Sequence, residues 1–110
     1  MTDSPVPYEN LDIPSYQQHR DNQLDHFLLD VRESWEYTMY RIPGAVNIPL
    51  NEVPARLNEI PDDKPVVVVC EHGVRSVYVS QYLSQQGYGG VYNLVGGTAE
   101  WVGRGLPIDR

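Results

Sequence analysis

The chain has 110 residues, of which 41% are hydrophobic and 10% aromatic, and its formal net charge is -7 at pH 7. This length is typical of one domain with a single core, and the composition is that of an ordinary globular protein. The negative charge argues against nucleic acid as a partner, because the phosphate backbone would be repelled. No apolar run approaches the roughly 18 residues that a membrane-spanning helix needs.

The N-terminal residues and the cysteine count indicate the cellular compartment of the protein. Residues 1–5 contain neither a basic stretch nor an apolar segment, so we expect no secretory signal. Cys70 is the only cysteine, which excludes a disulfide within the chain and fits a reducing, cytoplasmic location. The three histidines are scattered, so we expect neither a metal site nor a cofactor. Nothing in the sequence suggests a large exposed interface, and we expect a monomer.

Helix and strand patterns alternate along the chain. Residues 1–8 are polar and rich in proline, so we expect them to be frayed, which leaves residues 9–110 as one domain. Asp12 resembles a helix N-cap with proline in the first turn, and it predicts a short helix that ends at about Arg20. The later predicted elements are a strand over 27–31, a helix over 33–39, a strand over 45–48, a helix over 51–59 that Asn51 caps, a strand over 66–69, a helix over 74–86 that Gly87 ends, a strand over 91–95 and a helix over 98–102.

The run of four valines at 66–69 shows no polar alternation, as expected when both faces of a strand are covered. Together with the alternation of strands and helices, it predicts an α/β domain with a mostly parallel sheet and helices on both faces. Such folds bind ligands outside the carboxyl ends of their strands. Because Cys70 directly follows the valine run, we expect it at that edge of the sheet.

Cys70 opens a loop between a predicted strand and a predicted helix. The reactive form of a cysteine is the thiolate, and three features of the loop favour it. They are the positive end of the following helix, the backbone N–H groups of a tight turn that Gly73 permits, and the forked donors of Arg75. The loop is therefore a candidate for an activated sulfur nucleophile, and its sequence is Cys70-Glu71-His72-Gly73-Val74-Arg75-Ser76.

The other polar residues near this loop have less specific interpretations. Glu71 opposes a thiolate through its negative charge. His72 is able to donate a hydrogen bond or add charge below neutral pH, but alone it is more often a solvated loop residue. A cysteine after a valine run is also more often a small buried residue than a nucleophile. At the end of the 27–31 strand, a structural ion-pair or cap network is favoured over acid–base catalysis for Asp30, Arg32 and Glu33. Core or rim positions are the simplest interpretation of Trp35, Tyr37 and Trp101.

Four stretches between residues 28 and 101 match one known family in kind and in order. They are Leu28-Leu29-Asp30-Val31-Arg32-Glu33, Arg41-Ile42-Pro43-Gly44-Ala45-Val46-Asn47-Ile48-Pro49-Leu50, Cys70-Glu71-His72-Gly73-Val74-Arg75-Ser76, and Tyr92-Asn93-Leu94-Val95-Gly96-Gly97 with Trp101. With them the chain resembles a single-domain rhodanese, a rhodanese-like sulfurtransferase.

The resemblance implies a five-stranded, mostly parallel sheet flanked by helices. It also implies that Cys70 accepts a sulfane sulfur and becomes a persulfide, with a small-molecule sulfur donor and a thiol or protein as acceptor. No internal thiol is available to release that sulfur, so the acceptor comes from outside the chain. The implied substrate-binding residues are Glu71, His72, Gly73, Val74 and Arg75, and the implied supports of the loop are Ser76, Asp30 and Arg32.

The chain departs from the pattern of the family in two features, which involve three residues. Tyr40-Arg41 stands where Gly-His is frequent, which changes the rim of the site. Glu71 stands where a basic or small residue often follows the cysteine. With the net charge of -7, Glu71 weakens the case for free thiosulfate as the donor and favours a protein-bound or small-molecule persulfide.

The length of the loop distinguishes between reaction classes. Four residues separate Cys70 from Arg75, whereas the related phosphatases that use a cysteine and an arginine have one residue more. The shorter cradle favours a single sulfur atom over a phosphate group. Two alternatives stay open beside sulfur transfer: a non-catalytic interaction or regulatory module of the same fold, and a phosphatase or arsenate reductase.

Overall fold

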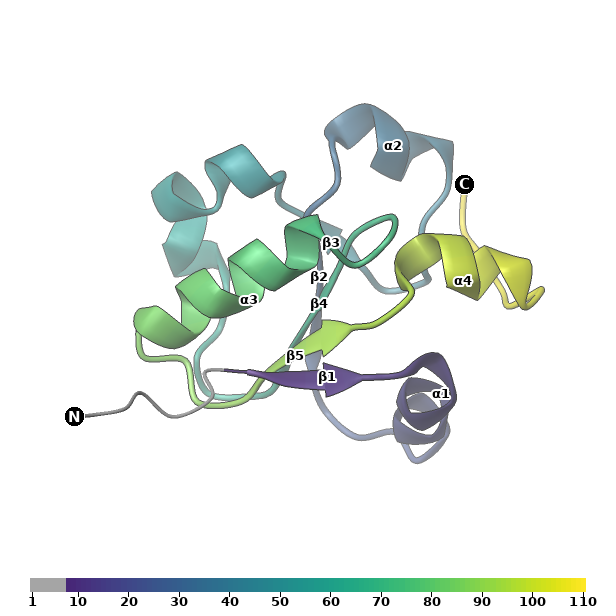
Figure 1. Ribbon diagram of the computed structural model, residues 1–110, viewed down its shortest axis with the longest axis horizontal. Coiled ribbons are helices and arrows are strands. Elements are labelled where there is room, and N and C mark those ends of the chain that lie inside the picture. Colours follow the sequence, from purple (N-terminus) through teal and green to yellow (C-terminus); the bar gives the residue numbers. More distant parts are fainter. Residues whose placement is uncertain (1–7) are drawn as a thin grey trace.

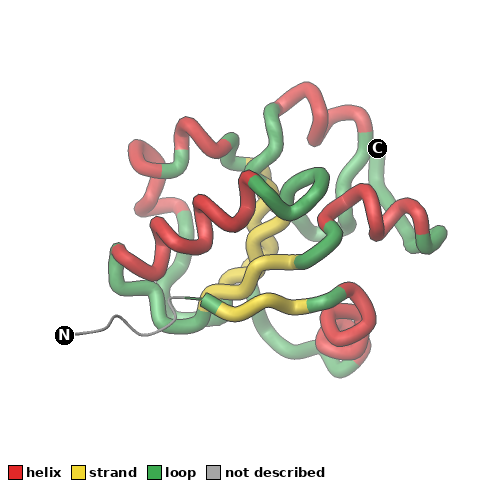
Figure 2. Tube along the Cα trace, viewed as in Figure 1, coloured by secondary structure: helices red, strands yellow, loops and turns green. Residues whose placement is uncertain are grey.

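The computed structural model describes residues 8–110, so the fraying expected of residues 1–7 lies outside the described residues, while Tyr8 packs against the core. Five parallel strands form one sheet in the order β1-β5-β4-β2-β3 (Figures 1 and 2). The predicted α/β class is thereby confirmed.

The elements are β1 (Glu9–Leu11), α1 (Ile13–Asp21), β2 (Phe27–Asp30), α2 (Ser34–Met39), β3 (Val46–Asn47), η1 (Leu50–Glu52), η2 (Pro54–Glu59), β4 (Val66–Val69), α3 (Arg75–Gln85), β5 (Val91–Leu94) and α4 (Gly97–Gly103).

The central strand β4 is covered on both faces, as its four valines predict. Val66 and Val68 belong to the core beneath α3 and the two short 3₁₀ helices. Val67 and Val69 belong to the opposite core, which α1 and α4 cover. Each of the four is at most 1% exposed. Side chains alternate between the faces of a strand, so Cys70 points to the same side as Val68 and joins the core beneath α3.

The strand β1 was not predicted from the pattern of residues along the chain. It lies at the edge of the sheet and pairs only with β5, in the register Glu9 with Tyr92 to Leu11 with Leu94. Glu9 and Asn10 are exposed. A three-residue edge strand that buries so little apolar surface leaves no alternation to detect. Apart from β1 and the 51–59 segment, each element ends within one residue of its prediction.

The helix predicted over 51–59 is wrong. The chain forms two 3₁₀ helices there, η1 and η2, and Asn51 lies inside the first instead of capping a helix. Pro54 has no N–H group to donate to a preceding turn. Arg56 has φ -116° and ψ 22°, which interrupts the helical conformation within η2. A continuous α-helix is therefore not formed by this segment.

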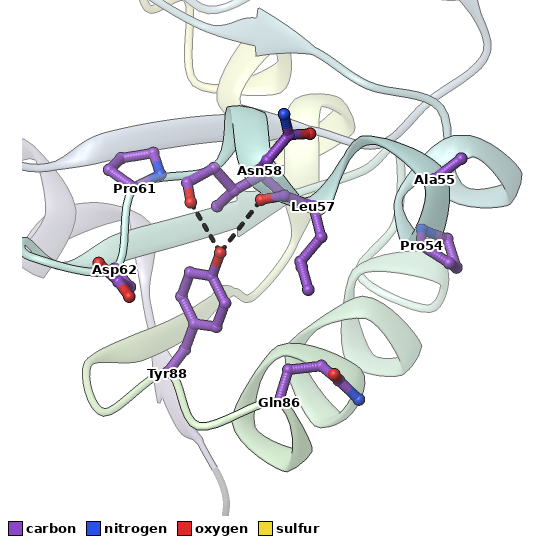
Figure 3. Close-up of a pocket in the computed structure, with 9 residues that line it drawn as sticks. Pro54, Ala55, Leu57, Asn58, Pro61, Asp62, Gln86 and Tyr88 are labelled. Atoms are coloured by element: carbon purple, nitrogen blue, oxygen red, sulfur yellow. Dashed lines mark hydrogen bonds between the residues drawn. The ribbon is translucent and has the colours of Figure 1, made fainter.

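Tyr88, after α3, stabilises the end of this 3₁₀ segment from across a groove (Figure 3). Its hydroxyl lies 3.2 Å from the carbonyl oxygen of Leu57 and 2.7 Å from that of Ile60. The hydroxyl is therefore a donor for two carbonyl groups at the end of the segment, where the last carbonyls of a helix lack α-helical partners. None of the helices in the described part of the chain has both the length and the apolar character needed to span a membrane.

A cluster of rings joins α1 to the sheet. Tyr16 is fully buried, and its hydroxyl lies 2.9 Å from Nε2 of His26 and 3.1 Å from Nη1 of Arg20. The ring of His19 lies 5.0 Å from that of His26, and its own Nε2 is buried with no hydrogen-bond partner. Burial, together with the neighbouring His26, lowers the pKa of His19.

The predicted N-cap of α1 is confirmed, because Ser15 donates its N–H to Asp12 at 2.8 Å.

We expect the protein to lose stability as the pH falls below the ordinary pKa of histidine, about 6.5. Because folding lowers the pKa of His19, the unfolded chain binds the proton more readily. The contribution of His19 is complete above that pH and is lost as the pH falls towards the lower value of the folded state. Urea titrations between about pH 8 and pH 5 measure the free energy of unfolding. His19→Gln should make it less dependent on pH, and an unchanged dependence would contradict this account.

Candidate active site

Cys70 lies at the carboxyl end of β4, where the loop 70–74 leads into α3 (Figure 1). Its side chain is 1% exposed. The sulfur accepts the backbone N–H of Gly73 at 3.1 Å and that of Ser76 at 3.3 Å. Gly73 has φ 91°, a conformation that glycine adopts readily. Two N–H groups and the start of α3 therefore surround the sulfur with donors that stabilise negative charge on it.

Ser76 connects the sulfur to two strands behind it. Its hydroxyl oxygen lies 3.3 Å from the sulfur of Cys70, and it donates to the side-chain oxygen of Asn93 at 2.5 Å. The amide nitrogen of Asn93 donates in turn to Asn10 of β1 at 3.1 Å. Ser76 and Asn93 are buried. Sequence reasoning missed the contribution of Asn93, because a polar residue inside an apolar strand does not reveal which side chain it faces.

The start of α4 holds the first two residues of the loop. Thr98 donates its N–H to the carbonyl of Cys70 at 2.9 Å, and Ala99 donates its N–H to the carbonyl of Glu71 at 3.0 Å. Gly97 has φ 62°, and a Cβ atom there would collide with both carbonyl oxygens. Only glycine allows this approach. Gly97 is therefore a point of contact between α4 and the Cys70 loop.

A buried ion pair stands beside the loop at the end of β2. Asp30 and Arg32 are at most 1% exposed, and the guanidinium donates to both carboxylate oxygens at 2.8–3.1 Å. It also donates to the carbonyl of Tyr40 at 2.7 Å. Burial opposes the charge of Arg32, but the hydrogen bonds and charge of Asp30 outweigh it, and the pKa of Arg32 lies above its ordinary value. The predicted ion-pair network at this strand end is confirmed.

Tyr40 and Glu71, two of the residues that depart from the family's pattern, touch each other. The hydroxyl of Tyr40 donates to the Glu71 carboxylate at 3.0 Å, and the hydroxyl of Thr98 donates to the same oxygen at 2.7 Å. Arg32 lies 3.9 Å from that oxygen, and its guanidinium covers the Tyr40 ring at 5.1 Å. Burial is the main cause that raises the pKa of Tyr40, which keeps the phenol a neutral donor. Arg41 lies instead over the ring of Tyr37.

Arg75 is bound by a carboxylate that sequence reasoning did not connect to it. Its Nη1 and Nη2 donate to the two oxygens of Glu36 on α2 at 2.7 and 3.0 Å. These hydrogen bonds lower the pKa of Glu36 and raise that of Arg75. Glu36 also accepts the N–H of Glu33 at 2.8 Å and completes the capping box of α2. The two residues are 39 positions apart, and only the packing of α2 against the start of α3 joins them.

The rim of the loop is partly apolar and exposed. His72 is exposed, as a solvated loop residue would be, and Val74 is 63% exposed. Trp35 and Met39 on α2 are 68% and 64% exposed, which places Trp35 at the rim, whereas Trp101 is buried in the core. A depression of about 140 Å³ lies between α2 and the loop, lined by Arg32, Trp35, Glu36, Met39, Tyr40 and Glu71.

A parallel sheet with a cysteine loop at the end of its central strand defines the class of rhodanese-like folds. Residues 13–104 match the rhodanese-like domain family. A sulfurtransferase of Allochromatium vinosum is 42% identical over 98 residues, which cover 89% of this chain and 92% of that protein. The thiosulfate sulfurtransferase GlpE of Glaesserella parasuis is 38% identical over 77% of this chain and 79% of its own. A rhodanese-related protein of Thermoplasma volcanium superposes with TM-score 0.84 at 28% identity, over 93% of this chain and 98% of that one. The chain belongs to the rhodanese-like family.

We expect Arg32→Met to lower the free energy of unfolding by about 3–5 kcal/mol, because it leaves the buried Asp30 carboxylate without its cation. Urea denaturation measures this loss. Arg56→Met is the matched control, since Arg56 pairs with Glu52 and Glu59 at the surface and its loss costs about 0–1 kcal/mol. Adding Asp30→Asn to Arg32→Met should restore part of the stability. Similar small losses in both single variants would contradict the account.

We expect Gly97→Ala to destabilise the protein by about 1–3 kcal/mol, because the new methyl group overlaps the Cys70 and Glu71 carbonyls and φ is positive there. Gly103→Ala in the same helix is the control, since no atom lies within 4 Å of its Cβ position. Thermal unfolding compares the two variants. Equal unfolding temperatures would show that the loop tolerates the methyl group.

Proposed function

We propose that this chain is a sulfurtransferase that carries a sulfane sulfur as a persulfide on Cys70. The observation that carries the proposal is the environment of the sulfur, which accepts N–H groups from Gly73 and Ser76 at 3.1 and 3.3 Å. Such donors stabilise a thiolate before the reaction and a persulfide anion after it. The names of the related sulfurtransferases support the same reaction class.

The first step loads the cysteine. The Cys70 thiolate attacks the outer sulfur of the donor, a sulfur–sulfur bond forms to Cys70, and the donor's own sulfur–sulfur bond breaks. With thiosulfate the leaving group is sulfite; with a persulfide R–S–SH it is the thiolate R–S⁻. In this scheme the backbone N–H groups from Glu71 to Arg75 hold the transferred sulfur, and Arg75 assists donor binding.

The second step unloads the cysteine. A thiolate R′–S⁻ attacks the outer sulfur of the Cys70 persulfide, which regenerates the Cys70 thiolate and forms R′–S–SH. In an assay, cyanide serves as the sulfur acceptor and leaves as thiocyanate. Because Cys70 is the only cysteine, the acceptor comes from outside the chain, and a covalent intermediate predicts ping-pong kinetics.

Residues around the loop support the position of Cys70. Ser76 positions the sulfur through its contacts with Cys70 and Asn93, while Asp30 and Arg32 brace the neighbouring strand end. The cradle from Cys70 to Arg75 suits one sulfur atom better than a phosphate group. We further propose that the domain of residues 9–110 acts as a monomer in the cytoplasm, where reducing conditions keep the thiol free.

We expect Cys70 to gain the mass of one sulfur atom when the protein is treated with thiosulfate or polysulfide. Intact-protein mass spectrometry measures the gain, and cyanide should reverse it with release of thiocyanate. Cys70→Ser should abolish both and leave the circular-dichroism spectrum unchanged. An unreactive thiol would favour a non-catalytic interaction module, turnover of a phosphate ester would favour a phosphatase, and activity of Cys70→Ser would refute the mechanism.

A further inference from the structure

The two arginines beside the Cys70 loop already have anionic partners. Arg75 donates two hydrogen bonds to Glu36 at 2.7 and 3.0 Å. Arg32 is 1% exposed and bound to Asp30 at 2.8 Å. A bidentate arginine–carboxylate pair is a strong, oriented contact. An incoming anion that needs Arg75 must therefore compete with Glu36 for it.

The depression next to the loop has an apolar and anionic lining. Trp35 and Met39 supply exposed apolar surface, while Glu36 and Glu71 supply two carboxylates. The charge of Arg32 is balanced by Asp30 and that of Glu36 by Arg75, which leaves the Glu71 carboxylate as the excess negative charge. At about 140 Å³ the depression has room for a small organic group. Its chemistry suits a neutral or cationic group and opposes an anionic one.

These two features act differently on the two kinds of sulfur donor. Thiosulfate carries two negative charges, and its sulfonate end would have to displace Glu36 from Arg75 or lie close to the carboxylates of Glu36 and Glu71. An organic persulfide brings its reactive sulfur to Cys70 on a carbon group that needs no cation. The charges at the mouth of the loop therefore favour a donor whose leaving group, the part bonded to the outer sulfur, carries no negative charge.

We propose that the sulfur donor is an organic persulfide, R–S–SH, whose R group lies in this depression and carries no negative charge, and that Glu36 determines this specificity by holding Arg75. The inference rests on the proposed function and names its substrate class. In the loading step the Cys70 thiolate bonds to the terminal sulfur, and the thiolate R–S⁻ leaves with the electron pair of the broken bond. No other oxidant or reductant takes part.

Four donors test the inference on the wild-type protein. They are the persulfides of cysteamine, 2-mercaptoethanol and 3-mercaptopropionate, which differ in the charge of R, and thiosulfate. Quenched-flow mass spectrometry measures the second-order rate at which each adds sulfur to Cys70. We expect the cationic and neutral persulfides to load about tenfold faster than the anionic one, and thiosulfate to be the slowest. This comparison does not depend on the folding of any variant.

Glu36→Gln tests the role assigned to that residue. Glutamine keeps the capping box with Glu33 and the size of the side chain but releases Arg75 from its charged partner. We expect loading by thiosulfate and by the anionic persulfide to rise about fivefold to tenfold relative to loading by the neutral persulfide. Glu59→Gln is the matched control, because it removes the same charge and also an arginine partner, Arg56, at another surface. It should leave all four rates unchanged.

The outcomes separate this inference from the proposed function. If no donor adds sulfur to Cys70, the proposed function itself fails. If thiosulfate loads the wild type as fast as the neutral persulfide, or if Glu36→Gln leaves the ratios between the loading rates of the donors unchanged, the inference fails and sulfur transfer stands. A lysine-flanked cysteine peptide, loaded as its persulfide, distinguishes the source: faster loading than cysteamine persulfide indicates a partner protein, and slower loading indicates a low-mass thiol.

Discussion

The contact between the start of α4 and the first residues of the Cys70 loop is the constraint on which the site depends. Two N–H groups of α4 bind the carbonyls of Cys70 and Glu71, and the missing side chain of Gly97 lets the two backbones meet. With its start held there, the loop turns back so that Gly73 and Ser76 reach the sulfur from the other side. The cradle is therefore built by three elements, β4, α3 and α4, and not by the loop alone.

Charge near the sulfur is organised in pairs. Asp30 neutralises Arg32 in the core, Glu36 neutralises Arg75 at the mouth, and the carboxylate of Glu71 is held by Tyr40, Thr98 and Arg32. The donors that remain directed at the sulfur are uncharged backbone N–H groups. Uncharged donors of this kind stabilise negative charge on a sulfur atom without presenting a free cation to solvent.

Prediction from the sequence succeeded where a local pattern carries a physical cause. Four consecutive valines require cover on both faces, and Cys70 at their end had to lie at the carboxyl edge of the sheet. It failed at β1, whose polar residues bury too little to show a strand, and at 51–59, where Pro54 and the non-helical conformation of Arg56 interrupt the expected helix. Edge strands and irregular helices depend on partners that the local sequence does not contain.

The sequence by itself determined the α/β class, the position of Cys70 and the spacing that brings N–H groups to its sulfur, because these follow from short-range backbone geometry. Only the tertiary structure decided what surrounds that sulfur. Asn93 behind Ser76, Gly97 against the Cys70 carbonyl and Glu36 on Arg75 come from separate elements. Such contacts arise when helices pack across the sheet, and a polar side chain in a linear sequence does not reveal which distant partner that packing provides.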